Sequence, residues 1–341
     1  MLEFRVRQLD ETTSTNDEVK RALEAGEPEG LAVRALRQTG GYGRQGRAWA
    51  SPEGGLYLSL LLRPQVDAAV LPTLSLVTGL AVRRAAAELL PPDAGETVLV
   101  KWPNDLVVPA VCRPLEPADA AAARATRSCG DAGGFAFAGP SACRPSEPLD
   151  AAAVRGTQSR GDAGGSRTEV RFASAIPTIS GTTDALADLL RQPAGNQPAG
   201  AASFRKLCGI SLEAHAGGVC VGIGVNVEPP DRADVAKVGG KNVPVYLPEL
   251  GFEGCVDDVA DAVLRAYAPL YRAWLSEGFA PLVDEYAAHA SLTGRSVRMV
   301  NRSGEPVAQG TVASVDEFGR LVLRASDGSL VPVASGEAHL V

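Results

Sequence analysis

The chain has 341 residues, of which 45% are hydrophobic and 21% charged, as in an ordinary globular protein large enough for two domains. Lysine and arginine number 33 against 40 acidic residues, so the formal net charge is −7, which argues against a protein that binds nucleic-acid phosphates through a basic face. No apolar run is long enough to span a bilayer, and the six cysteines form no CxxC pair. We therefore expect a cytoplasmic protein with reduced cysteines that binds neither nucleic acid nor membranes.

The first hundred residues alternate between predicted strands and helices. Strands are predicted over 2–9, 31–36, 56–62 and 97–102, and helices over 14–26 and 72–90. The apolar run at 56–62 is typical of a strand that is buried on both faces. This order predicts an α/β domain built on a sheet.

The composition changes after Val108. Residues 109–203 are rich in Ala, Gly, Pro, Ser and Arg, and two short patterns, Cys-Arg-Pro and Gly-Asp-Ala-Gly-Gly, each occur twice in them. A segment with so few large apolar groups cannot offset the entropy lost on ordering. We interpret it as a duplicated, low-complexity and largely disordered insertion, with a small regulatory module as the alternative.

Regular patterns return at Phe204. Strands are predicted over 204–210 and 219–227, helices over 256–274 and 280–290, and short strands with tight turns from Gly294 onward. Short strands of this kind are typical of a small β-barrel. The expected domains are therefore an α/β domain over 1–290, interrupted at about 109–203, and a barrel over 291–341.

A glycine-rich loop after the second strand is the first candidate for chemistry. Residues 40–47 hold four glycines and two arginines, Arg44 and Arg47. Glycines let backbone amides converge on an anion, and guanidinium groups bind phosphate or carboxylate in a fixed geometry. On its own the loop indicates an anion site no more strongly than a flexible turn, and it matches neither the dinucleotide fingerprint nor the P-loop.

Three weaker signals follow. Asn104 and Asp105 come at a strand end, where mixed sheets place ligands, and they suit a metal or a nucleotide as well as a solvated turn. Lys206 is one of only five lysines and precedes an apolar strand. The Gly-Ile-Gly at 222–224 lets a backbone pass close to a flat group or to a neighbouring strand.

Taken together and in order, these motifs resemble the biotin protein ligases of the monofunctional bacterial type. The motifs are STND (14–17), QTGGYGRQGRAW (38–49), KWPND (101–105), RKLCGI (205–210) and GIGVNV (222–227). The resemblance covers residues 1–108 and 204–341. It implies an α/β fold, a mixed sheet flanked by helices like that of class II synthetases, followed by an SH3-like β-barrel.

The resemblance also implies a reaction in two steps. Biotin and Mg²⁺-bound ATP form biotinyl-5′-AMP, and a lysine of the biotin carboxyl carrier protein of acetyl-CoA carboxylase then takes the biotin. The family needs no covalent enzyme intermediate, in keeping with the lack of a convincing nucleophile and base pair in the sequence. A homodimer of the chain is possible, and the sequence does not decide it.

Site residues follow from the same resemblance. Arg44 and Lys206 match the catalytic positions that hold the carboxylate and the α-phosphate. The positions that match biotin-binding residues are Ser14, Thr15, Asn16, Gln38, Tyr42, Gly43, Arg44, Trp49 and Lys206. Those that match the ATP site are Arg47, Asn104, Asp105 and Asn226, with Asp105 nearest the Mg²⁺. Tyr42 stands where the family usually has arginine, so only a backbone contact is implied there.

Two other functions are weighed against this one. A lipoate or octanoate ligase shares the catalytic fold, but the Ser-Thr-Asn set and Gln38 favour the polar ureido ring of biotin. A DNA-binding repressor of the family carries an N-terminal helix-turn-helix module, for which the residues before Ser14 leave no room. A scaffold that uses the insertion to tether a partner is a third alternative.

Overall fold

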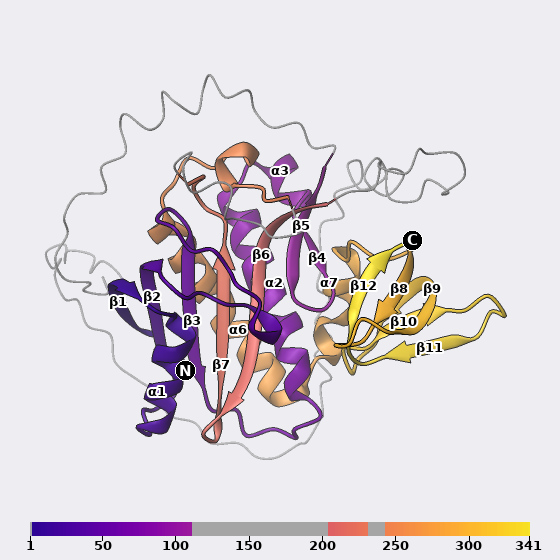
Figure 1. Cartoon of the computed structure of the whole chain (residues 1–341), viewed down its shortest axis with the longest axis horizontal. Coiled ribbons are helices and arrows are strands. Elements are labelled where there is room, and N and C mark those ends of the chain that lie inside the picture. The colour runs from indigo at the N-terminus through magenta and orange to yellow at the C-terminus, as the bar shows by residue number, and fades with distance from the viewer. Residues whose placement is uncertain (1, 111–203, 231–242) are drawn as a thin grey trace, which may run out of the picture. The chain divides into compact units, whose positions relative to one another are not determined.

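The computed structural model describes residues 2–110, 204–230 and 243–341, and the predicted insertion thus lies outside the described residues except at its first two positions (Figure 1). A seven-stranded mixed sheet forms the centre, in the order β1-β2-β3-β7-β6-β5-β4. Its strands are β1 (Arg5–Thr12), β2 (Leu31–Gln38), β3 (Leu56–Leu62), β4 (Leu99–Lys101), β5 (Asp105–Pro109), β6 (Phe204–His215) and β7 (Gly218–Val225). Only β1 and β2 pair in parallel; every other neighbouring pair is antiparallel.

Helices cover both faces of this sheet. Helix α1 (Thr15–Glu24) packs on one face, where Val19 and Leu23 meet Val33 and Leu61 in a small core. Helices α2 (Leu74–Leu89) and α6 (Val256–Glu277) cover the other face and contribute to the main core (Figure 1). The shorter helices are α3 (Pro92–Glu96), α7 (Val283–Ala288) and the 3₁₀ turns η1 (Arg44–Gly46), η2 (Leu71–Thr73), η4 (Leu247–Leu250) and η5 (Ala280–Leu282).

Strand β3 shows why the sheet needs two covered faces. All seven of its residues are buried, as the mostly apolar run predicted. Successive side chains of a strand point to opposite faces, so such a run must be packed from both sides. Ser59 is the polar exception in the run, and it faces α1, where it meets Thr15 and Asn16.

The C-terminal residues form a second sheet of five antiparallel strands, in the order β11-β10-β9-β8-β12. Its strands are β8 (Ser296–Val300), β9 (Pro306–Val315), β10 (Leu321–Arg324), β11 (Leu330–Val333) and β12 (Glu337–Leu340). The Trp102 indole Nε1 donates a 2.9 Å hydrogen bond to the Gly319 carbonyl before β10. A Cβ on Gly319 would stand 2.9 Å from both Leu76 and Thr73, so this turn packs closely on α2.

The described elements confirm the predicted fold class, a mixed α/β sheet with a small C-terminal β domain. Two strands were missed. Strand β5 is short and follows directly on a tight turn after β4, and β12 is half polar, so neither has a periodic pattern long enough to be recognised. The residue limits proposed for the two domains remain a prediction.

The segment 109–203 was predicted to interrupt a connection, and the described residues on either side of it are close together. Pro109, at the end of β5, lies directly opposite Phe204, at the start of β6, in antiparallel pairing. The two strands therefore meet as the two arms of a hairpin. Among the helices that the structure describes, none is long and apolar enough to cross a membrane.

Candidate functional site

Residues 39–50 form a hairpin-like loop between β2 and β3, which we call the flap. Its arms are joined by the Gly43 amide, which donates to the Arg47 carbonyl at 2.8 Å. At the tip, Gln45 and Gly46 have φ of 62° and 69°. Glycine adopts this left-handed conformation without strain, whereas glutamine pays a steric cost for it. The two residues together turn the chain sharply and keep the arms side by side.

Below the flap, the sheet carries glycines instead of side chains. Strands β6 and β7 place Gly209 opposite Gly224. A Cβ on Gly224 would stand 3.0 Å from the Nε1 of Trp49, and one on Gly209 would stand 3.1 Å from the same ring. A Cβ on Gly222 would stand 2.3 Å from the Oδ1 of Asn16. These glycines form a flat floor, and Trp49 of the flap lies directly over it.

Two cations reach the same place from different elements. The Arg44 Nη1 donates a 2.8 Å hydrogen bond to the Asn104 Oδ1, and the Lys206 Nζ lies 2.6 Å from the Asp105 Oδ1. The Lys206 ammonium also lies 5.2 Å from the centre of the Trp49 ring. Burial lowers the pKa of Arg44, while the field of Asp105 opposes that shift, so the guanidinium stays charged. The flap arginine and the rare lysine therefore contact two consecutive residues of the same turn, Asn104 and Asp105.

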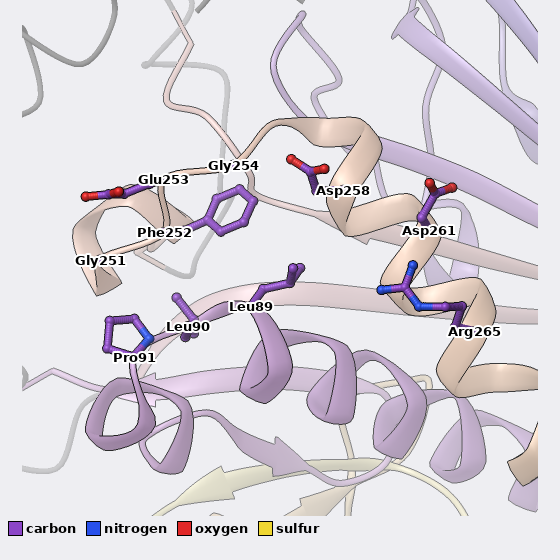
Figure 2. A pocket seen from close by; sticks show the side chains of 10 residues that line it. All are labelled: Leu89, Leu90, Pro91, Gly251, Phe252, Glu253, Gly254, Asp258, Asp261 and Arg265. Atoms are coloured by element: carbon purple, nitrogen blue, oxygen red, sulfur yellow. The ribbon is translucent and has the colours of Figure 1, made fainter. Parts of the chain in front are cut away.

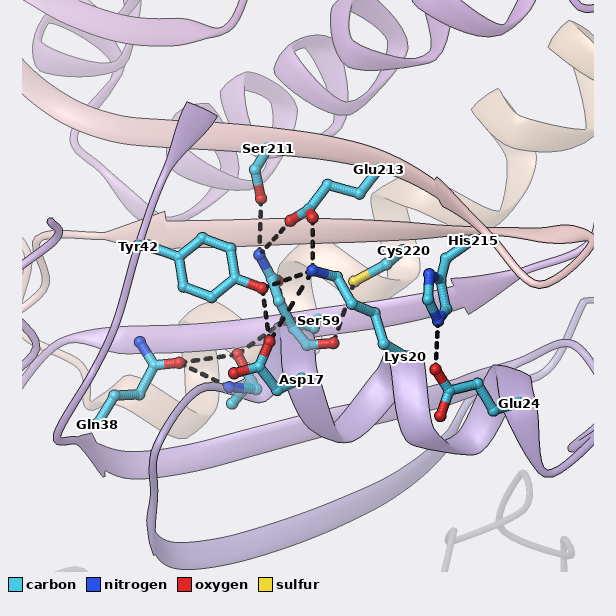
Figure 3. Close-up of polar contacts among 12 residues, drawn as sticks. Asp17, Lys20, Glu24, Gln38, Tyr42, Ser59, Ser211, Glu213, His215 and Cys220 are labelled. Atoms are coloured by element: carbon cyan, nitrogen blue, oxygen red, sulfur yellow. Dashed lines mark hydrogen bonds and ion pairs between the residues drawn. The ribbon is translucent and has the colours of Figure 1, made fainter. Parts of the chain in front are cut away.

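A row of polar side chains joins α1 to the start of the flap (Figure 3). The amide and Oγ1 of Thr15 both donate to the Gln38 Oε1, at 2.8 and 3.1 Å. The Ser59 Oγ lies 2.8 Å from the Thr15 Oγ1 and 2.6 Å from the Asn16 Oδ1. Ser14, immediately before α1, is buried beside them. Because Gln38 bonds Thr15, and Ser59 links Thr15 to Asn16, the orientations of these side chains are set before any ligand arrives.

The remaining predicted residues lie at the edges of this arrangement. Arg47 forms an ion pair with Glu337 of β12, so the flap contacts the C-terminal sheet. The side-chain amide Nδ2 of Asn226 donates at 2.9 Å to the backbone carbonyl of Lys206 and so supports the backbone that carries the lysine. The structure thus places Arg44, Lys206, Asn104, Asp105 and Trp49 together. It places Arg47 toward the C-terminal sheet.

Sequence reasoning missed several participants. Ser59 and Glu337 were not singled out, and the role of Lys20 and Glu213 beside Tyr42 was not foreseen. A serine inside a fully apolar strand was a usable signal, because a buried hydroxyl must find a partner. Glu337 gave no such signal, since one acidic residue in a short exposed strand is common.

An open pocket of about 550 Å³ lies elsewhere, between the end of α2 and the start of α6 (Figure 2). It is lined by Leu89, Leu90 and Phe252 with acidic residues around them, and none of the predicted site residues reaches it. The Asp258 carboxylate there accepts the Cys255 amide at 2.7 Å and serves the helix start. Across residues 2–110, 204–230 and 243–341, no three His, Cys, Asp or Glu side chains gather as a metal site would require.

Comparison with known families gives two matches. Residues 7–113 match the model of the biotin/lipoate A/B protein ligase family, and residues 293–341 match the biotin protein ligase C-terminal domain. The first match contains α1, the flap and the turn that carries Asn104 and Asp105. The second contains the whole five-stranded sheet.

Curated relatives match part of the chain. The bifunctional ligase/repressor BirA of Bacillus subtilis is 42% identical over 82 residues, which is 24% of each chain. The biotin–[acetyl-CoA-carboxylase] ligase of Mycobacterium tuberculosis is 40% identical over 107 residues, 30% of this chain and 40% of the relative. The chain thus aligns with only about a quarter to two fifths of the length of these relatives.

Solved structures extend the likeness to the whole fold. The biotin protein ligase from Aquifex aeolicus, in complex with biotin and ATP, superposes with a TM-score of 0.60 and 21% identity, covering 99% of this chain and 98% of that one. A biotin protein ligase-like protein of unknown function from silicibacter sp. tm1040 has a TM-score of 0.54 and 12% identity. At these identities the likeness shows a shared fold.

Proposed function

Because residues 7–113 match the biotin/lipoate A/B protein ligase family and residues 293–341 match the biotin protein ligase C-terminal domain, we propose that the chain is an ATP-dependent biotin protein ligase. In the first step, a carboxylate oxygen of biotin attacks the α-phosphorus of ATP, and pyrophosphate leaves. In the second, the neutral amine of a carrier lysine attacks the carbonyl of the mixed anhydride, an amide forms, and AMP leaves. The relatives named as biotin–[acetyl-CoA-carboxylase] ligases support the choice of reaction and of the carboxyl carrier protein.

The observation that carries this proposal is that Arg44 and Lys206 contact the adjacent residues Asn104 and Asp105, with the Lys206 ammonium beside the Trp49 ring. A carboxylate and a triphosphate repel one another, so their reaction requires cations between them. A charge-assisted hydrogen bond contributes about 1.5–3 kcal/mol, and the loss of one donor to the transition state slows catalysis by about 10²–10³. One guanidinium on a flap and one ammonium on a strand suit this task.

The biotin end of the site is supported by the polar row and the glycine floor. Thr15 and Gln38 hold one another, and Ser59 and Ser211 hold Asn16. Together these side chains offer an ordered set of donors and acceptors to a ureido ring. The Trp49 indole lies directly against the glycine floor, so it forms a wall beside which the bicyclic ring of biotin can pack. We place biotin there, with its carboxylate directed toward Lys206.

The ATP end is assigned to Arg47, Asn104, Asp105 and Asn226. Mg²⁺ is usually held in proteins by one or two carboxylates together with phosphate oxygens rather than by a full protein cage. Asp105 fits that donor set, and the described residues offer no larger cluster. When bound, the ion would neutralise charge on the phosphates. Asp105 itself holds the Lys206 ammonium at 2.6 Å and so keeps it at the reacting centre.

A cytoplasmic location belongs to the same proposal. Both substrates of the first step are metabolites of the cytoplasm. The Cys208 and Cys220 thiols are buried, and burial raises the pKa of each well above its ordinary value, so they stay unreactive in a reducing compartment.

The direct test is mass spectrometry of a biotin carboxyl carrier domain incubated with the full chain, Mg²⁺, ATP and biotin. We expect the carrier mass to increase by one biotinyl group, and AMP and pyrophosphate to appear. The Arg44→Ala variant should reduce the initial rate by about 10²–10³. Arg265→Ala is the matched control, because Arg265 is exposed and paired with Glu88 on a distant surface.

In a second set of reactions, lipoate or octanoate replaces biotin. Transfer of lipoate at the rate expected for biotin would contradict the proposed substrate and leave the ligase chemistry intact. A wild-type chain that modifies the carrier with neither acid would contradict the proposed function altogether.

A further inference from the structure

The flap is anchored to α1 by a cluster of charged groups that the reaction above does not use (Figure 3). The Lys20 Nζ donates to the Tyr42 hydroxyl at 2.7 Å and lies 2.6 Å from the Glu213 Oε2. The Tyr42 hydroxyl in turn donates to the Asp17 Oδ1 at 2.6 Å. Lys20 and Asp17 belong to α1, Glu213 to β6, and Tyr42 to the flap. We call these four residues the latch.

The latch is complete as a hydrogen-bonding unit. A tyrosine hydroxyl donates one hydrogen bond and accepts others, and here it accepts from an ammonium and donates to a carboxylate. The Lys20 ammonium also lies 5.1 Å from the centre of the Tyr42 ring, in the geometry of a cation–π contact. Side chains of Lys20 and Glu213 are only 23% and 32% exposed, so water competes weakly for these bonds.

Electrostatics keep the latch in one protonation state. Burial alone would lower the pKa of Lys20, but the hydrogen bonds to Glu213 and Tyr42 outweigh it and raise the pKa above its ordinary value. Burial, together with the bond to Asp17, raises the pKa of Tyr42 to about 12. The ammonium and the neutral phenol therefore persist throughout the physiological range of pH. A lysine that stays protonated is also unable to attack an acyl-adenylate formed nearby.

The position of Tyr42 makes the latch relevant to the site. Tyr42 pairs across the flap with Ala48; Trp49 directly follows Ala48, and Arg44 comes two residues after Tyr42. Holding the Tyr42 ring therefore restrains both the guanidinium at the flap tip and the indole over the glycine floor. The other arm is anchored separately, because the Gln38 Nε2 donates to the Ser51 Oγ at 2.8 Å.

We propose that Lys20 and Asp17 are positioning residues which, through the hydroxyl of Tyr42, hold the flap closed and so set how long the enzyme retains its acyl-adenylate. The inference rests on the proposed function for the identity of the retained intermediate. A mixed anhydride is hydrolysed when it reaches water, so an enzyme of this kind benefits from a flap that opens slowly. Tyr42 thus gains a side-chain role at a position where only a backbone contact was expected.

The first experiment needs no substrate. Hydrogen exchange of the full chain is compared for wild type, Tyr42→Phe, Lys20→Met and the control Arg21→Met. Tyr42→Phe keeps the ring and loses both hydrogen bonds. Arg21 is the neighbouring cation on α1 and pairs with Glu18 outside the latch. We expect the bonded amides of Gly43 and Trp49 to exchange about tenfold faster in the two latch variants, as for the loss of one charge-assisted hydrogen bond, with β7 and the control unchanged.

The second experiment measures the lifetime of the intermediate. Enzyme loaded with radiolabelled biotinyl-AMP is chased with excess unlabelled biotin and ATP. We expect the label to leave about tenfold faster from Tyr42→Phe and Lys20→Met, whereas Arg21→Met retains it as wild type does. In Lys20→Met, which alters no residue predicted to bind a substrate, the KM for biotin should rise while kcat for adenylation changes less than twofold, because Lys20 does not touch the reacting atoms. Lys20→Arg should restore part of the lifetime, since it keeps a charged donor.

Each outcome decides one question. Unchanged exchange in the flap of both latch variants would overturn the inference, and so would faster exchange spread evenly over the sheet, which indicates general destabilisation. Flap amides that loosen without a shorter lifetime of the adenylate would overturn it as well. A wild-type chain that forms no biotinyl-AMP contradicts the proposed function, and that failure is recognised separately because the exchange experiment contains no substrate.

Discussion

At the scale of single residues, each cation of the candidate site already has a partner from the chain. Lys206 is held by Asp105 and Arg44 by Asn104, so the anionic groups of the proposed substrates would enter a site whose charges are oriented in advance. Orientation before binding lowers the cost of reorganising the site as charge develops in the reaction. Although the formal net charge of the protein is −7, these contacts hold two positively charged side chains close together at the candidate site.

Lys206→Ala tests this description. Because the ammonium matters most when negative charge develops at the α-phosphate, we expect kcat for biotinyl-AMP formation to fall by about 10²–10³, while the Kd for biotin changes less than about fivefold. Pyrophosphate release measures the first quantity and calorimetry the second. Equal losses in both would mean that Lys206 contributes only to binding of the ground state. Arg265→Ala serves again as the control.

At the scale of elements, an ion pair joins α2 to α7 behind the sheet. Arg84 donates to both carboxylate oxygens of Glu285, at 2.7 and 2.6 Å. The hydrogen bonds from Arg84 lower the pKa of Glu285 below its ordinary value of 4.5. A carboxyl whose pKa is lowered on folding stabilises the protein above its unfolded pKa, and that contribution disappears as pH falls through the folded value.

Glu285→Gln should therefore have a pH-dependent effect. We expect its Tm to lie below that of wild type at pH 7, and the difference to shrink below about pH 4.5 and vanish once Glu285 is protonated. Differential scanning calorimetry from pH 7 to pH 3 measures both. Glu88→Gln is the control, since its pair with Arg265 is exposed on both sides and contributes little at any pH. A constant difference in Tm across the range would contradict the assignment.

At the scale of the whole molecule, the long segment after Pro109 leaves and rejoins the sheet at a single point. Pro109 and Phe204 face each other across β5 and β6, so the segment connects strand ends that are already adjacent. Each doubling of loop length costs only about 0.6 kcal/mol of closure entropy, so even a very long insertion is tolerated there. The sheet does not depend on that segment to bring the two strands together.

We predict that deletion of residues 110–202, with a short turn joining β5 to β6, leaves the rate of biotinyl-AMP formation within about twofold of wild type. The measurement is pyrophosphate release, after circular dichroism has shown that the variant folds. A matched deletion that also removes β5, and with it Asp105, should lose activity. A folded variant of the first kind that cannot form the adenylate would show that the segment has a function in catalysis.

The order of elements and most of the site motifs could be read from the sequence, because they are local. The apolar run of β3, the helix start after Ser14 and the glycine-rich flap each depend on neighbours a few residues away. Periodicity and turn chemistry act over the same short range, so a single sequence displays them. The family resemblance then assigned roles to those motifs as predictions.

The tertiary structure alone decided which of these groups meet. Gly209 became part of a floor only because antiparallel pairing of β6 with β7 sets it opposite Gly224. The Tyr42 hydroxyl meets Lys20, and Lys20 meets Glu213, only because α1 packs beside β6, a strand far away in the sequence. Contacts between segments so far apart depend on how helices and strands pack on the sheet, and no local pattern encodes that packing.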